Sequence, residues 1–172
     1  MSALLRVYQP GIDRFDRRGY PLAWDHSVEG LPPITHYVRD TAGHRCERCS
    51  HPFRVGISSA AWSPCDERCT HGGKTRKVDG QVEAWYRVLT VHHLNGAKAD
   101  CRWWNLAALC QACHLSIQAR VIMERPWLAE HTPWFRLHAA GWYAVKYLDS
   151  DLDRSEVEAR LDELLALERE RT

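Results

Sequence analysis

The pattern of apolar and polar positions divides the 172-residue chain into three parts. Residues 1–32 are rich in Pro, Gly and charge and lack a helical or strand period, so they predict an irregular arm. A core follows at 33–125, and its first element is a short helix over Pro33–Thr41. Inside the core, 53–80 hold scattered Gly and Pro and predict a loop-rich insertion. Residues 126–172 form a C-terminal helical extension.

Two further elements are predicted inside the core. Glu83–Leu94 is rich in β-branched and aromatic residues and predicts a strand, which the Asn95-Gly96 turn closes. A helix is predicted from about Asn105, because apolar residues recur there at spacings of three and four. These are Leu106, Leu109, Cys110, Cys113, Ile117 and Val121. One strand region and several helices predict an α+β fold.

The C-terminal extension carries two helix-start signals. Thr132-Pro133 is a cap and first-turn pair that opens one helix. Ser155 with Glu158 has the spacing of a capping box and predicts an amphipathic helix for the acidic tail. We expect this tail helix to pack on the body of the protein or on a partner.

Charge is distributed unevenly along the chain. The total is 23 Lys+Arg against 22 Asp+Glu, but Asp149–Thr172 hold nine acids and four bases, leaving 19 bases and 13 acids elsewhere. A mildly basic body suits a polyanionic partner, and a solvated helix face is the alternative interpretation. Apolar runs are too short for a membrane span, and no secretory signal is expected.

Four of the seven cysteines stand in two C-x-x-C pairs, Cys46 with Cys49 and Cys110 with Cys113. Zn²⁺ prefers four ligands in a tetrahedron, and each pair supplies two thiolates from one turn. Cys110 and Cys113 share one face of the predicted helix because they are three residues apart. The spacing therefore predicts a closed structural zinc site that fastens the first pair to the helix.

The other cysteines support a second hypothesis. Cys65, Cys69 and His71 are spaced as loop ligands of a second zinc, which Cys101 or another group would complete, and small buried thiols are the alternative. The second C-x-x-C and the histidine after it also have the form of a c-type haem attachment. Haem attachment normally accompanies export and would leave the first C-x-x-C without a role, so zinc is favoured.

A histidine pair, an asparagine and a cysteine–histidine stretch follow one another along the core. His92 and His93 end the predicted strand, Asn105 starts the predicted helix, and His114 directly follows the last C-x-x-C. This order resembles the HNH nuclease family, whose small ββα-metal core is a two-strand hairpin and a helix around one metal ion, often fastened by C-x-x-C pairs. The resembling stretches are Arg87–Gln118 and Cys46–Cys49.

The resemblance implies a role for each of these side chains. His93 corresponds to the general base that takes a proton from the attacking water, and His92 to the metal ligand before it. Asn105 corresponds to the asparagine that braces the loop orienting the base. His114 corresponds to the metal ligand on the helix, and Gln118 stands where colicin-type members place a further histidine ligand. The implied reaction is metal-dependent hydrolysis of DNA to a 5′-phosphate and a 3′-hydroxyl.

These residue types suit that reaction on general grounds. Neutral imidazoles leave a divalent ion, such as Mg²⁺, Mn²⁺, Ni²⁺ or Zn²⁺, electropositive enough to stabilise the charge that develops on phosphate. A histidine with an unperturbed pKa of about 6.5 is mostly neutral at pH 7 to 8 and can accept a proton. Phosphate contacts are expected from nearby cations. The candidates are Lys98 and Arg102 after the strand, and Lys74, Arg76 and Lys77 in the insertion.

The sequence thus predicts a zinc-stapled, HNH-like DNA endonuclease of the cytoplasm of a bacterial or phage-infected cell, not bound to a membrane. The alternative is a zinc-ribbon module that binds nucleic acid or protein without turnover. Three roles are open for the acidic tail. It could mask the basic body, pack as a bundle helix, or recruit a larger assembly such as phage packaging machinery.

Overall fold

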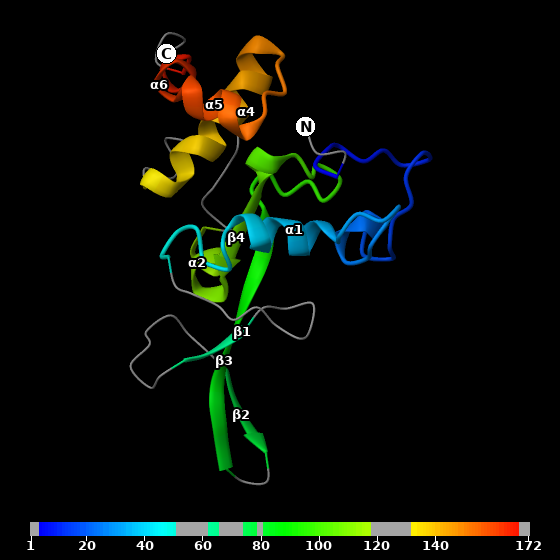
Figure 1. Cartoon of the computed structure of the whole chain (residues 1–172), viewed down its shortest axis with the longest axis vertical. Helices are drawn as coiled ribbons and strands as arrows, with labels where there is room; N and C mark the ends of the chain where they lie inside the picture. Colours follow the sequence, from blue (N-terminus) through cyan, green and yellow to red (C-terminus); the bar gives the residue numbers. More distant parts are fainter. Residues whose placement is uncertain (1–3, 51–61, 66–73, 79–80, 118–131, 169–172) are drawn as a thin grey trace. The chain divides into compact units, whose positions relative to one another are not determined.

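A long strand is the centre of an antiparallel sheet. β3 (Gln81–His93) pairs antiparallel with β1 (Trp62–Cys65) on one side and with β2 (Lys74–Val78) on the other. A fourth strand, β4 (Leu106–Cys110), also pairs with β3. The predicted strand is confirmed to within a few residues. Together with the helices, the sheet confirms the mixed α+β class (Figure 1).

The computed structural model describes residues 4–50, 62–65, 74–78, 81–117 and 132–168. The chain divides into two compact units, which we name by their main elements. The sheet unit comprises Ala23–His92 and Ala107–Ala119; the helical unit comprises Met1–Leu22, His93–Leu106 and Arg120–Thr172. The helical unit therefore draws on the arm, the core and the C-terminal extension, which the sequence analysis kept as separate segments.

The first helix of the sheet unit confirms its prediction. α1 (Ile34–Thr41) begins directly after Pro33, and Gly43 beyond its end has a φ of +59°. Ile34 and Val38 are buried, and the Arg39 Nε donates to the carbonyl of Leu89 in β3 at 2.9 Å. α1 is thus fixed to the central strand by apolar packing and by one long-range hydrogen bond.

Two predictions for the core need correction. The insertion at 53–80 is not wholly loop, because it contains β1 and β2. The helix predicted from about Asn105 is wrong at its start: Trp103–Asn105 form a 3₁₀ turn (η2), Leu106–Cys110 form β4, and α2 begins only at Gln111 and ends at Ile117. All five residues of β4 are buried, and periodicity cannot distinguish a short buried apolar strand from a helix.

In the helical unit, α4 (Arg136–Leu148) packs against η2. Trp104 is fully buried, and its ring centroid lies 5.3 Å from that of Trp142. The His138 Nδ1 is 2.9 Å from the Trp104 carbonyl oxygen. The two elements meet at Gly141, where a Cβ would lie only 2.6 Å from the Trp104 Cβ. Trp104 is therefore a core residue of the helical unit.

The acidic tail packs on α4 as part of a helical bundle. The extension opens at Thr132 and Pro133 as predicted, although through a 3₁₀ turn (η3, Pro133–Phe135) before α4. The tail forms two short helices, α5 (Arg154–Ala159) and α6 (Leu161–Ala166), and both contact α4. The Tyr143 hydroxyl of α4 donates to the Glu168 carboxylate. Of the three roles open for the tail, this arrangement fits packing as bundle helices.

The capping box predicted at Ser155 and Glu158 is wrong, because it lies two residues earlier. Asp153 accepts a hydrogen bond from the Glu156 N–H at 2.9 Å, and the Glu156 carboxylate accepts one from the Asp153 N–H at 2.7 Å. Ser155 instead donates its hydroxyl to Asp153. Both pairs have the same spacing, but a full negative charge interacts more favourably than a hydroxyl with the helix N-terminus.

Candidate metal-binding and catalytic sites

The four cysteines of the two C-x-x-C pairs lie together in the sheet unit. Cys46 and Cys49 lie on the turn after α1, Cys110 ends β4, and Cys113 is on α2. Their sulfur atoms all lie within 4.8 Å of one another, and three of the four residues are buried. Within the described part of the chain, they form the one cluster of three or more metal-binding side chains.

Residues around the cluster hold the two cysteine turns together without using a thiol. The Glu47 N–H donates to the Ala108 carbonyl at 2.9 Å, and the Ala108 N–H donates to the Glu47 carboxylate at 2.6 Å. Arg48 donates to the Ser116 hydroxyl of α2 at 2.7 Å. The residues between Cys46 and Cys49 are therefore bonded directly to β4 and α2.

The cluster has the dimensions and the electrostatics of a zinc site. Zn–S bonds of about 2.3 Å in a tetrahedron place the sulfurs about 3.8 Å apart, and the Cys49 and Cys110 Sγ atoms are 3.9 Å apart. The hydrogen bond between Cys46 and Cys110 and the burial of the pair raise the pKa of Cys110, while the same bond lowers the pKa of Cys46. The crowded thiols resist ionising together, so four thiolates need a cation. The residues are compatible with structural zinc.

Two of the predicted catalytic-metal ligands lie side by side in the sheet unit. His92 comes from the end of β3 and His114 from α2, and their ring centroids are 4.3 Å apart with a tilt of 48°. Both rings are partly exposed. Burial lowers the pKa of His114, which favours the neutral imidazole that binds metals. The structure therefore brings together two imidazoles that the sequence separates widely.

Thr90 orients His114 and was not identified by the sequence analysis. Its hydroxyl donates to the Leu109 carbonyl at 2.8 Å and lies 3.3 Å from the His114 Nδ1. Since the single hydroxyl hydrogen is used on Leu109, the oxygen can only accept from an Nδ1–H on His114. This assigns the proton to Nδ1 and leaves Nε2 as the nitrogen with a lone pair.

His93, the predicted base, belongs to the helical unit. Its side chain is 6% exposed, and Nε2 lies 3.8 Å from the Cys101 Sγ. Burial lowers its pKa to about 4, opposed by the nearby Asp100 carboxylate and by a hydrogen bond to the Lys98 carbonyl. The imidazole is therefore neutral at pH 7, as the prediction requires, although for a different reason than an unperturbed pKa.

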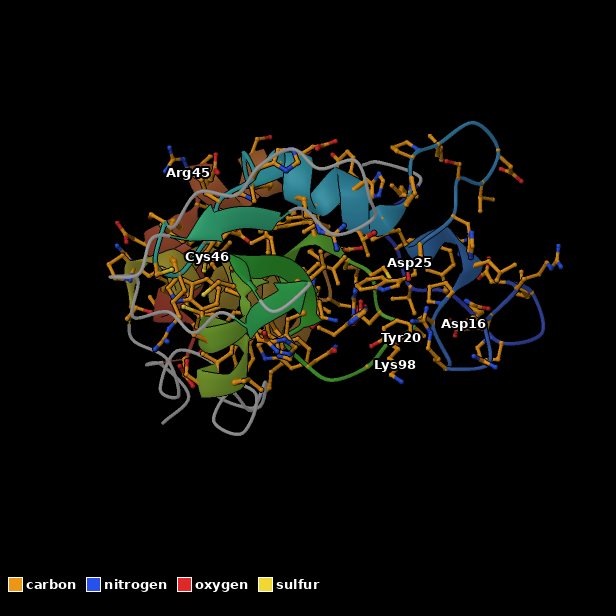
Figure 2. The ribbon with its side chains drawn as sticks, turned by 90° about the horizontal axis from the view of Figure 1, so that it is seen from below. Asp16, Tyr20, Asp25, Arg45, Cys46 and Lys98 are labelled. Carbon is orange, nitrogen blue, oxygen red and sulfur yellow. The ribbon has the colours of Figure 1, made fainter. Side chains whose placement is uncertain are left out.

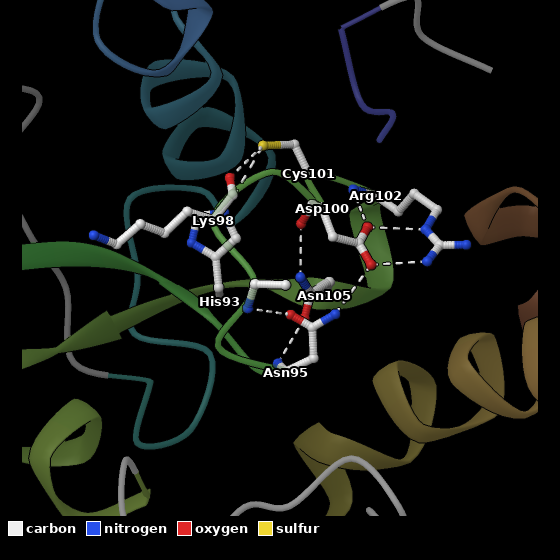
Figure 3. A network of polar contacts seen from close by, with 8 residues as sticks. His93, Asn95, Lys98, Asp100, Cys101, Arg102 and Asn105 are labelled. Atoms are coloured by element: carbon white, nitrogen blue, oxygen red, sulfur yellow. Dashed lines mark hydrogen bonds and ion pairs between the residues drawn. The ribbon is translucent and has the colours of Figure 1, made fainter. Parts of the chain in front are cut away.

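Asn105 clamps the turn that follows His93 (Figure 3). Its side-chain oxygen accepts from the Asn95 N–H at 2.8 Å, and its amide nitrogen donates to the Asp100 carbonyl at 2.6 Å. Its backbone carbonyl accepts from the Leu94 N–H at 2.8 Å. One fully buried side chain therefore bonds both ends of the turn and so braces the loop that follows His93.

The two predicted phosphate contacts in this turn differ in their surroundings. Arg102 makes two hydrogen bonds to the Asp100 carboxylate, at 2.9 and 2.8 Å, and lies over the Trp104 ring. Lys98 is exposed and donates to the carbonyl of Arg18. Arg102 is thus engaged in holding the turn, and Lys98 is the better placed of the two to meet a phosphate.

Several predicted site residues lie wholly or in part outside what the structure describes. Gln118, Cys69 and His71 lie outside the described residues. The side chains of Cys65, Lys74, Arg76 and Lys77 also lie outside what the structure describes, although their backbone belongs to β1 and β2. The second zinc site therefore stays a prediction. Cys101, its fourth member, is buried beside His93.

No family model, no curated protein and no solved structure matches this chain. In the described part of the chain, no helix is long and apolar enough to cross a membrane.

Proposed function

We propose that this protein is a divalent-metal-dependent DNA endonuclease of the HNH type, with a structural zinc on Cys46, Cys49, Cys110 and Cys113. The observation that carries the proposal is the contact between the imidazoles of His92 and His114. A purely structural zinc ribbon needs the four cysteines alone. The adjacent imidazole pair offers a second, chemically different place for a cation.

His92 and His114 would hold the catalytic cation, which would be Mg²⁺, Mn²⁺, Ni²⁺ or Zn²⁺. Thr90 would keep His114 in the tautomer that presents Nε2. Two protein nitrogens leave coordination positions for water and phosphate oxygens, as catalytic sites require. When bound, the cation supplies positive charge that offsets the negative charge developing on the phosphate.

His93 would be the general base, directly next to His92 in the chain. It is neutral at pH 7, and one ring nitrogen bonds the Lys98 carbonyl, which leaves the other free of a proton. That nitrogen can take a proton from an attacking water. The clamp by Asn105 holds the turn that carries Lys98 and so fixes the orientation of the imidazole. Base catalysis of this kind contributes about 10²- to 10⁴-fold in rate.

A second function is favoured by one observation. His93 is buried against Cys101, whereas a base must reach a water molecule and its substrate. This burial suits a zinc-stabilised module that binds nucleic acid without cleaving it, in which His93 only supports the turn. The two functions make different predictions for DNA nicking.

The deciding experiment measures the rate at which the zinc-loaded protein nicks supercoiled plasmid DNA in the presence of Mg²⁺, Mn²⁺ or Ni²⁺. The variants are His93→Ala and His114→Ala, and the matched control is His36→Ala, since His36 is exposed on α1 and outside both sites. We expect wild type and His36→Ala to nick the plasmid, and both site variants to lose at least about 100-fold in rate.

Zinc content and circular dichroism verify that each variant is folded. Nicking by His93→Ala at the wild-type rate would remove His93 as the base. Absence of nicking by the folded wild type in all three metals would reject the nuclease and leave the binding module.

A further inference from the structure

The N-terminal arm forms a defined turn over residues 14–22, which we name the arm turn. The Asp16 N–H donates to the Tyr20 carbonyl at 2.8 Å. The Asp16 carboxylate accepts from the backbone N–H groups of Arg18, at 2.8 Å, and Tyr20, at 3.0 Å. Gly19 supplies the φ of +81° that the reversal needs. The arm is therefore shaped by local hydrogen bonds, although the sequence shows no helix or strand period there.

The arm turn is attached to the turn that follows the predicted base. The Lys98 Nζ donates to the Arg18 carbonyl at 2.7 Å and lies 4.6 Å from the centroid of the Tyr20 ring. The Tyr20 ring centroid is in turn 5.8 Å from that of His93. Figure 2 shows Tyr20 of the arm next to Lys98 of the turn after β3. A cationic and aromatic surface therefore lies beside His93 within the helical unit.

This surface carries excess positive charge. Arg14, Arg17, Arg18 and Lys98 are exposed, and Asp16 is the one acid among residues 14–22. Asp16 is ion-paired with Arg18. Among the described residues, no ion pair neutralises Arg14 or Arg17. Lys98 keeps two ammonium hydrogens after its bond to the Arg18 carbonyl, because an ammonium group has three.

We infer that the arm turn and Lys98 are a DNA-contacting surface, on which Arg14, Arg17 and Lys98 bind backbone phosphates and Tyr20 supports Lys98. The inference deepens the proposed function, on which it rests for the identity of the polyanion. Cations that contact phosphates position a nucleic acid without reading its sequence. Because the Tyr20 ring that contacts Lys98 lies 5.8 Å from the His93 ring, a strand presented to His93 would pass close to Lys98.

The test measures binding of a short fluorescein-labelled DNA duplex by fluorescence anisotropy. Divalent cation and chelator are both omitted, so the DNA stays intact and the zinc stays bound. The test variant is Arg14→Ala with Arg17→Ala. The matched control is Arg136→Ala with Arg154→Ala, which also removes two arginines from the helical unit, but ion-paired ones on α4 and α5.

We expect the arm variant to bind about tenfold more weakly at moderate salt, with the slope of log Kd against log salt reduced by about two. The control should stay within about twofold of wild type, because its arginines are already ion-paired with Asp162 and Glu158. Equal Kd and equal salt slope for the arm variant and wild type would overturn the inference. Absence of DNA binding by wild type would overturn it as well.

The nicking assay separates this result from the proposed function. If wild type binds DNA through the arm turn but never nicks plasmid, the DNA-contacting surface is supported and the nuclease function is rejected. Nicking by the arm variant at the wild-type rate over a range of DNA concentrations would reject the surface and keep the nuclease. A raised KM with unchanged kcat in the arm variant is the outcome expected if both hold.

Discussion

The two units of this protein stabilise their functional residues by different means. In the sheet unit, four sulfur atoms meet within 4.8 Å, and the turns around them are linked through Glu47 and Ala108. In the helical unit, the turn after His93 has no such cluster among its described residues and is held by the buried amide of Asn105 and the packing of Trp104. One unit has a cysteine cluster that could hold a metal ion, and the other is held by hydrogen bonds and aromatic contacts. Removing the metal or removing a hydrogen bond should therefore destabilise one unit and leave the other intact.

The largest effect is expected from loss of the zinc. Structural zinc contributes on the order of 10 kcal/mol to the folding of small domains, so Cys110→Ser should unfold the region around the cluster. Hydrogen exchange measured by mass spectrometry should show loss of protection in α1, β4 and α2 while α4 keeps its protection. The control is Cys101→Ser, which alters a buried cysteine outside the cluster. Equal exchange patterns for Cys110→Ser and Cys101→Ser would contradict the idea that only the sheet unit depends on a metal.

The next effect concerns the clamp in the helical unit. Asn105→Ala leaves the Asn95 N–H and the Asp100 carbonyl without their partner, which costs about 2 to 4 kcal/mol of unfolding free energy. Asn105→Asp also loses the donor and places a buried carboxylate oxygen against the Asp100 carbonyl, so its loss should be at least as large. Urea denaturation measures both, and zinc content should not change. A urea midpoint equal to that of wild type in the alanine variant would show that the amide is not a clamp.

A smaller effect is expected at the imidazole pair of the sheet unit. Thr90→Val removes the hydroxyl that orients His114, and partners of this kind contribute about 10- to 100-fold to metal affinity. Thr90→Ser keeps the hydroxyl and should bind nearly as tightly as wild type. Calorimetric titration of the zinc-loaded protein with Mn²⁺ or Ni²⁺ compares the two. Equal metal affinities for Thr90→Val and Thr90→Ser would mean that the Thr90 hydroxyl does not orient His114.

The smallest effect is expected at the N-terminus of α5. The hydrogen bond from the Glu156 N–H lowers the pKa of Asp153 below its ordinary value of 3.8. The ionised carboxylate therefore stabilises the fold above that pH, and this contribution is lost as the pH falls through the lowered pKa. Asp153→Ala should reduce the melting temperature by a few degrees at neutral pH, and by less in strong acid. Ser155→Ala is the control. A larger fall in melting temperature for Ser155→Ala than for Asp153→Ala would support the capping box predicted from the sequence.

The sequence predicted the features that depend on local spacing. The two C-x-x-C pairs, the strand ending at the histidine pair and the helix after Pro33 all follow from residues close together in the chain, and the structure contains each of them. The meeting of His92 with His114 was expected only through the family resemblance. Spacing alone cannot place a strand end beside a helix.

The features that were missed depend on tertiary contacts. Leu106–Cys110 is a strand because β3 offers it hydrogen-bonding partners, and its apolar run fits a helix equally well. Thr90 contributes only to strand propensity until its hydroxyl is placed between Leu109 and His114. The arm turn is built from side-chain hydrogen bonds of Asp16 and from Lys98, far along the chain, so no period reveals it.

The close approach at Gly141 limits how this protein can vary. Any side chain at that position would collide with Trp104, and the neighbouring Trp103 ring atoms lie 3.0 and 3.1 Å from the same point. A bulkier residue in the middle of α4 would push η2 away, and Asn105 is the last residue of η2. A single methyl group on α4 would thus disturb the turn that Asn105 holds, although α4 carries none of the residues of either candidate site.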